Sequence, residues 1–204
     1  GEEISMQDVA PANIMDIGEA TAVSSDGSMV VGINSWDDQW NQRGYTYNTL
    51  TGELTILEMS EECPWWDWFC FGSKPFNPYD ISDDGTMVGA FGTASGAGAT
   101  IVNDVLGTQK LVDCLKAQGV INANDLGIAS TANKISSNGK HIVGWTAVDG
   151  YFGSFKLTLD QLYVCRNGKT RQVGYPGGVA SQLEQGATLG MCEADLPLNY
   201  RGNF

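Results

Sequence analysis

The sequence predicts an all-β chain: three propeller-blade-like repeats of short antiparallel strands, then a small disulfide-stapled C-terminal segment with one short helix. Three observations lead to this prediction. A strand–turn–strand phrase occurs three times, and its central glycines, Gly27, Gly85 and Gly139, lie 58 and 54 residues apart. Glycine makes up 26 of the 204 residues, roughly twice its average share. Beyond residue 162 the phrase is absent, and two cysteines bracket a Gly-rich stretch. We therefore expect repeats at about 18–60, 78–118 and 130–160 within residues 1–162, and a separate module at 163–204.

Each copy of the phrase centres on a glycine that follows an acidic or amide residue. The predicted turns are Asp26–Gly27, Asp84–Gly85 and Asn138–Gly139. Such pairs supply the positive φ values of a tight hairpin turn, and the serine before them can bond to the turn backbone. A second hairpin of alternating apolar and polar residues follows each copy, over residues 44–57, 99–112 and 153–159. Four short strands per repeat is the content of one propeller blade.

The first copy, from Ala20 to Gly32 with the aromatic strand and Thr-Gly hairpin of 45–57, resembles the HAF-type extracellular repeat of bacterial secreted proteins. The resemblance covers about residues 18–160 and implies a β-propeller-like, exported protein, but no reaction. The other copies depart from the pattern, with Asn138 in the third turn. The phrase is also similar to the Asp-box of sialidases, which is a structural turn. Sialidase chemistry needs an arginine cluster, and arginine occurs only at positions 43, 166, 171 and 201.

The module at 163–204 is predicted to be closed by a Cys165–Cys192 disulfide and to contain a helix ending at Gly186. The frame from Cys165 to Cys192 resembles a small C-terminal module of secreted bacterial proteins. That module carries histidines, and this chain has Arg166, Gln182 and Gln185 in their places. We therefore expect a disulfide staple and no metal site.

The remaining cysteines and the charge restrict the compartment and the partners. Cys63 and Cys70 are predicted to form a second local disulfide, and Cys114 to be a buried free thiol. Disulfides indicate an extracellular, cell-surface or periplasmic location, with a signal peptide already removed. With His141 as the single histidine and no C-x-x-C pair, a zinc site is not expected. The net charge of −13 excludes a nucleic-acid partner, and no apolar run reaches the length of a membrane span.

Two tryptophan-rich loops are the candidate binding residues. They contain Trp36, Trp40, Trp65, Trp66 and Trp68. Tryptophans beside carboxylates stack on sugar rings, dominate protein contacts, or form a small core around a disulfide, and the sequence leaves all three open. Prolines 64, 75 and 78 predict that the second segment is an ordered loop and not a strand.

The leading functional prediction is an exported, non-catalytic binding or assembly module without a cofactor. No acid, base or nucleophile stands in a recognisable constellation. The adjacent carboxylates Asp37/Asp38 and Asp83/Asp84 keep a polysaccharide-degrading enzyme as a minor alternative, beside a carbohydrate-binding, lectin-like propeller. A calcium site in the acidic turns is not expected, because no D-x-D-x-D-G loop is present.

The number of repeats predicts association. Propellers close with about four to eight blades, so three repeats leave blade faces or strand edges open. Open edges favour pairing with another chain. We therefore expect self-association, as an oligomer or filament, or completion by further blades of a longer propeller-forming chain.

Overall fold

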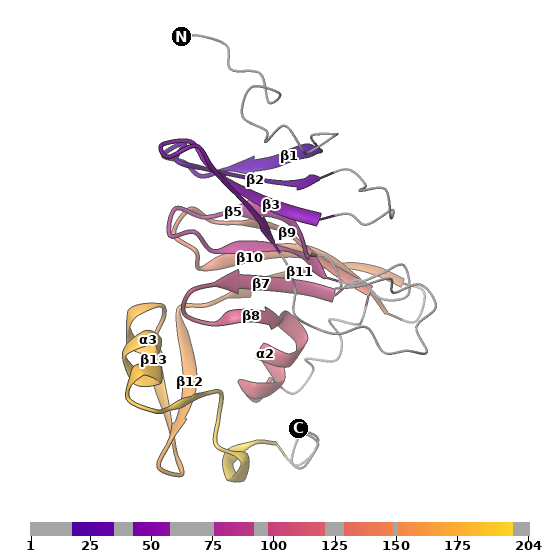
Figure 1. The fold of residues 1–204 in the computed structure, drawn as a ribbon. Helices are drawn as coiled ribbons and strands as arrows, with labels where there is room; N and C mark the ends of the chain where they lie inside the picture. Colours follow the sequence, from indigo (N-terminus) through magenta and orange to yellow (C-terminus); the bar gives the residue numbers. More distant parts are fainter. Residues whose placement is uncertain are drawn as a thin grey trace, which may run out of the picture.

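The computed structural model describes residues 18–34, 43–57, 76–91, 98–120, 129–148 and 151–197. These residues form four antiparallel sheets, with helices only near the exit of the second sheet and in the C-terminal region (Figure 1). The predicted fold class is confirmed: the described part of the chain is mostly strand, and its short strands are antiparallel throughout.

The first two sheets each have four strands in sequential order and are named the first and second blades. The first blade contains β1 (Glu19–Val23), β2 (Met29–Asn34), β3 (Arg43–Asn48) and β4 (Glu53–Leu57). The second contains β5 (Phe76–Ile81), β6 (Met87–Phe91), β7 (Gly98–Asn103) and β8 (Gly107–Lys110). The third blade has three strands, β9 (Ala129–Ile135), β10 (His141–Val148) and β11 (Tyr151–Thr158). We expected a fourth strand there, but the next strand along the chain pairs elsewhere.

That next strand, β12 (Gln161–Arg166), lies at the centre of the fourth sheet, between β13 (Lys169–Gly174) and β14 (Thr188–Leu189). Helix α3 (Gly177–Glu184) and the 3₁₀ helix η2 (Glu193–Asp195) complete this C-terminal region. The predicted helix is therefore present, and it ends at Glu184, two residues before the expected end at Gly186. Gly186 lies just beyond it with φ of 82°, a value that favours glycine at a helix end.

A bulge in the first strand of every blade faces a glycine in the second strand. The register shifts between Ala20 and Ala22 in β1, between Pro78 and Asp80 in β5, and between Ala132 and Lys134 in β9. The glycines that end the repeated phrase, Gly32, Gly89 and Gly144, pair with the residue beside each bulge. A Cβ added at any of these glycines would lie much closer than 3.0 Å to a carbonyl oxygen of the bulged strand. The final glycine of the phrase is thus required by close backbone approach.

Successive blades pack face to face, with the first strand of one lying on the sheet before it. Strand β5 contacts β1, β2 and β3, and β9 contacts β5, β6 and β7 in the same arrangement. A small core joins the first two blades, formed by Val31, Phe76, Ile81 and Met87. A larger core runs through the second and third blades into the C-terminal region. A fully buried aliphatic side chain in these cores contributes about 1.5–3 kcal/mol.

Two local predictions were wrong. Residues Leu111 and Val112, expected to continue a strand, begin helix α2 (Leu111–Ala117), which buries Leu111 and Cys114. Pro78, expected in a loop, lies inside β5. Proline is tolerated there because β5 is an edge strand and Pro78 adjoins the bulge, where a ladder hydrogen bond is not needed. Its carbonyl accepts a hydrogen bond from Thr21 Oγ1 of the first blade at 2.7 Å.

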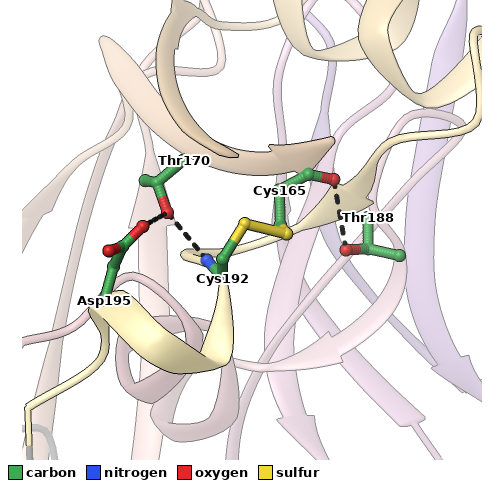
Figure 2. Close-up of a disulfide and its surroundings, with 5 residues drawn as sticks. All are labelled: Cys165, Thr170, Thr188, Cys192 and Asp195. Carbon is green, nitrogen blue, oxygen red and sulfur yellow. Dashed lines mark hydrogen bonds between the residues drawn. A yellow bond between two sulfur atoms is a disulfide. The ribbon is translucent and has the colours of Figure 1, made fainter. Parts of the chain in front are cut away.

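The C-terminal region is closed by the predicted Cys165–Cys192 disulfide, which joins β12 to the segment before η2 (Figure 2). Thr170 on β13 accepts the Cys192 N–H at 2.8 Å and donates its hydroxyl to Asp195 at 2.6 Å. The Met191 N–H donates to the carbonyl of Ala117 at 2.7 Å. The disulfide region is therefore attached to the end of α2, which follows the second blade.

Candidate functional site

The three Asp/Asn-Gly turns have the predicted internal geometry. Gly27, Gly85 and Gly139 have φ of 72°, 80° and 72°, and each donates its N–H to the carbonyl of the serine three residues earlier. The serine hydroxyls of the first and third turns donate to the side-chain oxygen of Asp26 (2.6 Å) and Asn138 (2.7 Å). The second turn has the same bond between Ser82 and Asp84. The repeated phrase is thus a self-contained turn whose own side chains satisfy its backbone.

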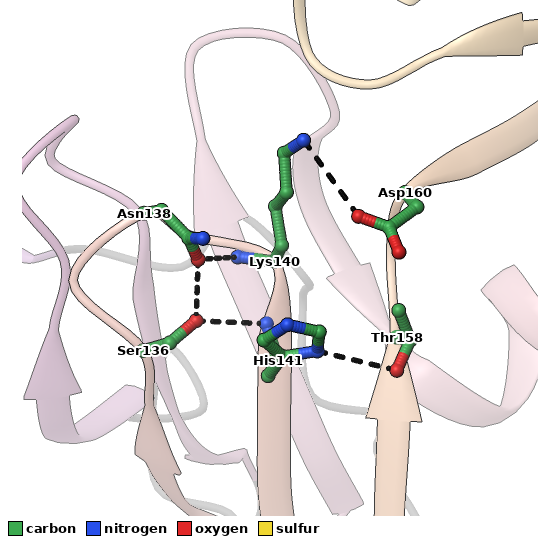
Figure 3. Close-up of polar contacts among 6 residues, drawn as sticks. All are labelled: Ser136, Asn138, Lys140, His141, Thr158 and Asp160. Carbon is green, nitrogen blue, oxygen red and sulfur yellow. Dashed lines mark hydrogen bonds and ion pairs between the residues drawn. The ribbon is translucent and has the colours of Figure 1, made fainter.

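The single histidine of the sequence, His141, lies just after the third turn (Figure 3). The backbone N–H of His141 donates to Ser136 Oγ at 2.9 Å, and the ring Nδ1 of His141 lies 3.3 Å from Thr158 Oγ1 on β11. Lys140 forms an ion pair with Asp160 at 3.6 Å. Within the described chain the His141 ring is paired with this threonine hydroxyl on β11.

The turns of neighbouring blades are joined in a row, which we call the turn ladder. It links Ser25, Asp83 and Ser137, which occupy the same position in the first, second and third turns. The Ser25 N–H donates to Asp83 Oδ1 at 3.0 Å, and the Asp83 N–H donates to the Ser137 carbonyl at 2.9 Å. Asp83 therefore acts as a connector between blades. It does not pair with its neighbour Asp84 as an acid–base couple, because Asp84 bonds inside its own turn.

Hydrogen bonds to the turn carboxylates lower their pKa values. Bonds from the Ser24 hydroxyl and then from the N–H and hydroxyl of Ser28 lower the pKa of Asp26 to about 2. Burial raises the pKa of Asp84, but bonds from the hydroxyls of Ser82 and Thr86 and from the Thr86 N–H together outweigh it, and the pKa lies below its ordinary value of 3.8. Both carboxylates are therefore ionised at neutral pH.

Asparagine at position 84 should remove part of the acid sensitivity of the fold. The lowered pKa of Asp84 in the folded chain stabilises the fold at pH values above 3.8, which is the ordinary pKa of the group. This contribution to stability is lost as the pH falls toward the pKa of Asp84 in the folded chain. In Asp84→Asn we expect little change at neutral pH, because Asn138 accepts the corresponding bonds in the third turn. Below about pH 4 its stability should fall less steeply than that of the native chain.

Urea unfolding followed by circular dichroism between neutral pH and about pH 2 measures this difference. Asp104→Asn, at an exposed position in the β7–β8 turn, controls for the loss of one negative charge. Equal acid dependence in Asp84→Asn and the native chain would contradict the prediction.

The third blade exposes a face of its sheet that is buried in the first and second blades. The strand register aligns Val31, Val88 and Val143, each of which pairs with the residue just after the bulge of the first strand. Val31 and Val88 are 0% exposed because β5 and β9 lie on them, whereas Val143 is 42% exposed. At a second aligned set, Ala90 is buried in the second blade and Trp145 is 39% exposed in the third.

We name this surface the open face of the third blade. Pairing across β9, β10 and β11 places at its centre Lys134, Val143, Trp145, Phe152, Ser154 and Lys156. The Trp145 and Phe152 rings contact each other with centroids 5.9 Å apart, and Phe152 is 81% exposed. The centre of the face therefore combines an aromatic pair and a valine with two lysines, and none of its six residues is acidic. Exposed aromatic residues of this kind are typical of protein contacts.

Several predicted site residues lie outside the described part of the chain. These are the candidate binding residues Trp36, Trp40, Trp65, Trp66 and Trp68, the carboxylates Asp37 and Asp38, and the predicted Cys63–Cys70 disulfide. Trp145 and Phe152, by contrast, are not among the sequence candidates. The sequence signal that could have found them is that no fourth copy of the phrase follows the third.

The described part of the chain contains no cluster of three or more His, Cys, Asp and Glu that could hold a metal ion. Cys114 is a buried free thiol, as predicted, and burial together with the Asp113 charge raises its pKa to about 11. A thiol with so high a pKa is protonated and unreactive at neutral pH. No helix among the described residues is both long and apolar enough to cross a membrane.

No protein-family model matches the chain, and no curated protein matches its sequence. Among solved structures, the crystal structure of TolB from Acinetobacter baumannii is similar, with a TM-score of 0.44 and 11% sequence identity. The match covers 77% of this chain and 41% of TolB, so the chain spans less than half the length of that protein. A similarity at this level assigns no family.

Proposed function

We propose that the chain is an exported, non-catalytic assembly module that binds another protein blade through the open face of the third blade. The observation that carries this proposal is the contrast between Val143, which is exposed, and its aligned residues Val31 and Val88, which are fully buried under the next blade. A surface built like two buried interfaces is suited to the same kind of partner. Export is supported by the Cys165–Cys192 disulfide, because disulfides persist in oxidising compartments.

The chemistry of the open face favours a protein partner. Trp145 and Phe152 supply a large apolar area with few rotatable bonds, and residues of this type dominate the energy of protein interfaces. Strand β11 is exposed along most of its length, so a partner has access to the whole width of the sheet.

The proposal is tested by sedimentation velocity of the purified chain at micromolar concentration. We expect a species heavier than the 21.8 kDa monomer for the native chain. Trp145→Glu should weaken association at least about tenfold, because it places a charge at the centre of the contact. Gln172→Glu is the matched control for the added negative charge: Gln172 is exposed on β13 of the C-terminal region, outside the three blades.

Circular dichroism of both variants checks that the fold is retained. Association that Trp145→Glu leaves unchanged would overturn the proposal. A monomeric chain that binds polysaccharide through Trp145 would overturn it in favour of the carbohydrate-binding alternative.

A further inference from the structure

We propose that the partner of the open face is the first blade of a second copy of this chain, so that two copies close head to tail into a six-bladed ring. This inference rests on the proposed function and specifies its partner. Six blades lie within the range of about four to eight at which propellers close. In such a dimer the two contacts are equivalent, and the two-fold axis runs through the centre of the ring.

The interface between blades already occurs twice within the chain in the same form. Strand β5 lies on β1, β2 and β3 of the first blade, and β9 lies on β5, β6 and β7 of the second. In each case the bulged first strand of one blade crosses the first three strands of the blade before it. Continuing this series places β1 of a second copy on β9, β10 and β11, the three strands that carry the open face.

The first blade supplies the matching half of the contact. The register aligns Val23, Ile81 and Ile135, each of which is the last residue of the first strand in its blade. Ile81 and Ile135 are buried against the preceding blade, at 5% and 8% exposure, whereas Val23 is 56% exposed. Each copy therefore carries both halves of one interface at opposite ends of its blade series, which allows head-to-tail contact and closure into a ring.

The turn ladder continues in the same direction. Ser25 donates its N–H to Asp83, and Asp83 donates its N–H to Ser137, always from one blade to the next. In the ring, Ser137 of one copy takes the donor position and Ser25 of the second copy takes the acceptor position. Both residues are exposed in the single chain, so they are accessible to a second copy.

Charge favours this head-to-tail arrangement over pairing of two third blades. Two open faces in contact would place the exposed Lys156 of both copies in one interface, and like charges that face each other are destabilising. Such pairing would also leave Val23 of both copies exposed.

Cysteine cross-linking at the turn ladder tests the arrangement. The reference variant is Asp83→Cys with Ser137→Cys in one chain, where a backbone hydrogen bond of 2.9 Å holds the two positions together. It should form a disulfide within the chain and shows that this pair of ladder positions is compatible with disulfide geometry. The test itself mixes Ser25→Cys with Ser137→Cys under mild oxidation and identifies the linked peptides by mass spectrometry. A disulfide between the thiols introduced at positions 25 and 137 is named the 25–137 link.

We expect covalent dimers only in the mixture, and each of them should contain the 25–137 link. Up to about half of all dimers should be covalent, because random pairing of the two variants makes about half of the dimers mixed. The chain with both substitutions should form closed dimers without larger species. A dimer from Ser137→Cys alone would indicate contact between two third blades, and a series of larger species from the double variant would indicate an open filament. Either result overturns the ring.

The outcome is separable from that of the proposed function. If Trp145→Glu disrupts association but the 25–137 link is absent, the open face binds a partner and the head-to-tail ring is wrong. If Trp145→Glu has no effect on association, the proposed function is wrong. Adding Trp145→Glu to the chain with both cysteine substitutions should lower the yield of the cross-linked dimer about tenfold.

Discussion

Alanine at Gly89 is expected to destabilise the chain by about 3 kcal/mol or more, among the largest effects of any single methyl group in the described blades. The added Cβ would meet the carbonyl oxygen and carbon of Asn77 and the backbone of Pro78, all within 3.0 Å. These are main-chain atoms of the bulged strand β5 of the second blade, which packs on the first blade and also contacts β9 of the third. The clash is therefore relieved only by separating β5 from β6, which disrupts two blade interfaces.

Urea unfolding followed by circular dichroism measures the loss for Gly89→Ala. The matched control is Gly153→Ala in β11, where the nearest atom to an added Cβ is Thr146 Cγ2 at 3.8 Å. That substitution should be neutral or slightly stabilising, because alanine loses less conformational entropy than glycine on folding. If both variants unfold at similar urea concentrations, close backbone approach does not explain the glycine that ends the repeated phrase.

Replacing both Cys165 and Cys192 by serine is expected to lower the stability of the C-terminal region by roughly 3–4 kcal/mol. The disulfide closes a loop with a sequence separation of 27 residues, and the entropy of that loop in the unfolded chain gives this magnitude. The effect should be local. The amides of Met191 and Cys192, which donate to Ala117 and Thr170, should exchange with solvent faster, whereas those of β6 should change little.

Hydrogen exchange measured by mass spectrometry checks this prediction segment by segment. Reduction of the native chain should reproduce the effect, since the same bond is removed. Addition of reductant to the double-serine variant isolates any contribution from the predicted Cys63–Cys70 disulfide. Unchanged exchange around Met191 in the variant would show that the hydrogen bonds of Thr170 hold the segment without the Cys165–Cys192 bond.

The features that the sequence predicted well are those whose causes are local. The Asp/Asn-Gly turns are determined by a few adjacent residues, and their serines, carboxylates and glycines make the expected bonds. The Cys165–Cys192 disulfide and the end of α3 before Gly186 follow from similarly short signals. In each turn the residues that define the feature also satisfy its hydrogen bonds.

The features that the sequence did not predict depend on distant parts of the chain. Leu111 and Val112 fit a strand as well as a helix, and helix α2 is selected by packing of its buried side chains against the common core. Pro78 breaks a strand in general but not at an edge beside a bulge. The exposure of Val143 is invisible in its repeat, because Val31 and Val88 occupy the same position and differ only in having a blade above them.

The hydrogen bond from Met191 to Ala117 sets an order for the folding of the chain. It joins the C-terminal segment to the end of α2 across a long stretch of sequence that includes the entire third blade. Contacts between residues so far apart in sequence form late, because the loop that they close costs more entropy than local turns do. The three turns can form as soon as their own residues are available, whereas the end of α2 gains its hydrogen bonds to Tyr163 and Met191 only from segments that follow the third blade. The end of a blade that is complete early in the sequence is therefore held in part by the far end of the chain.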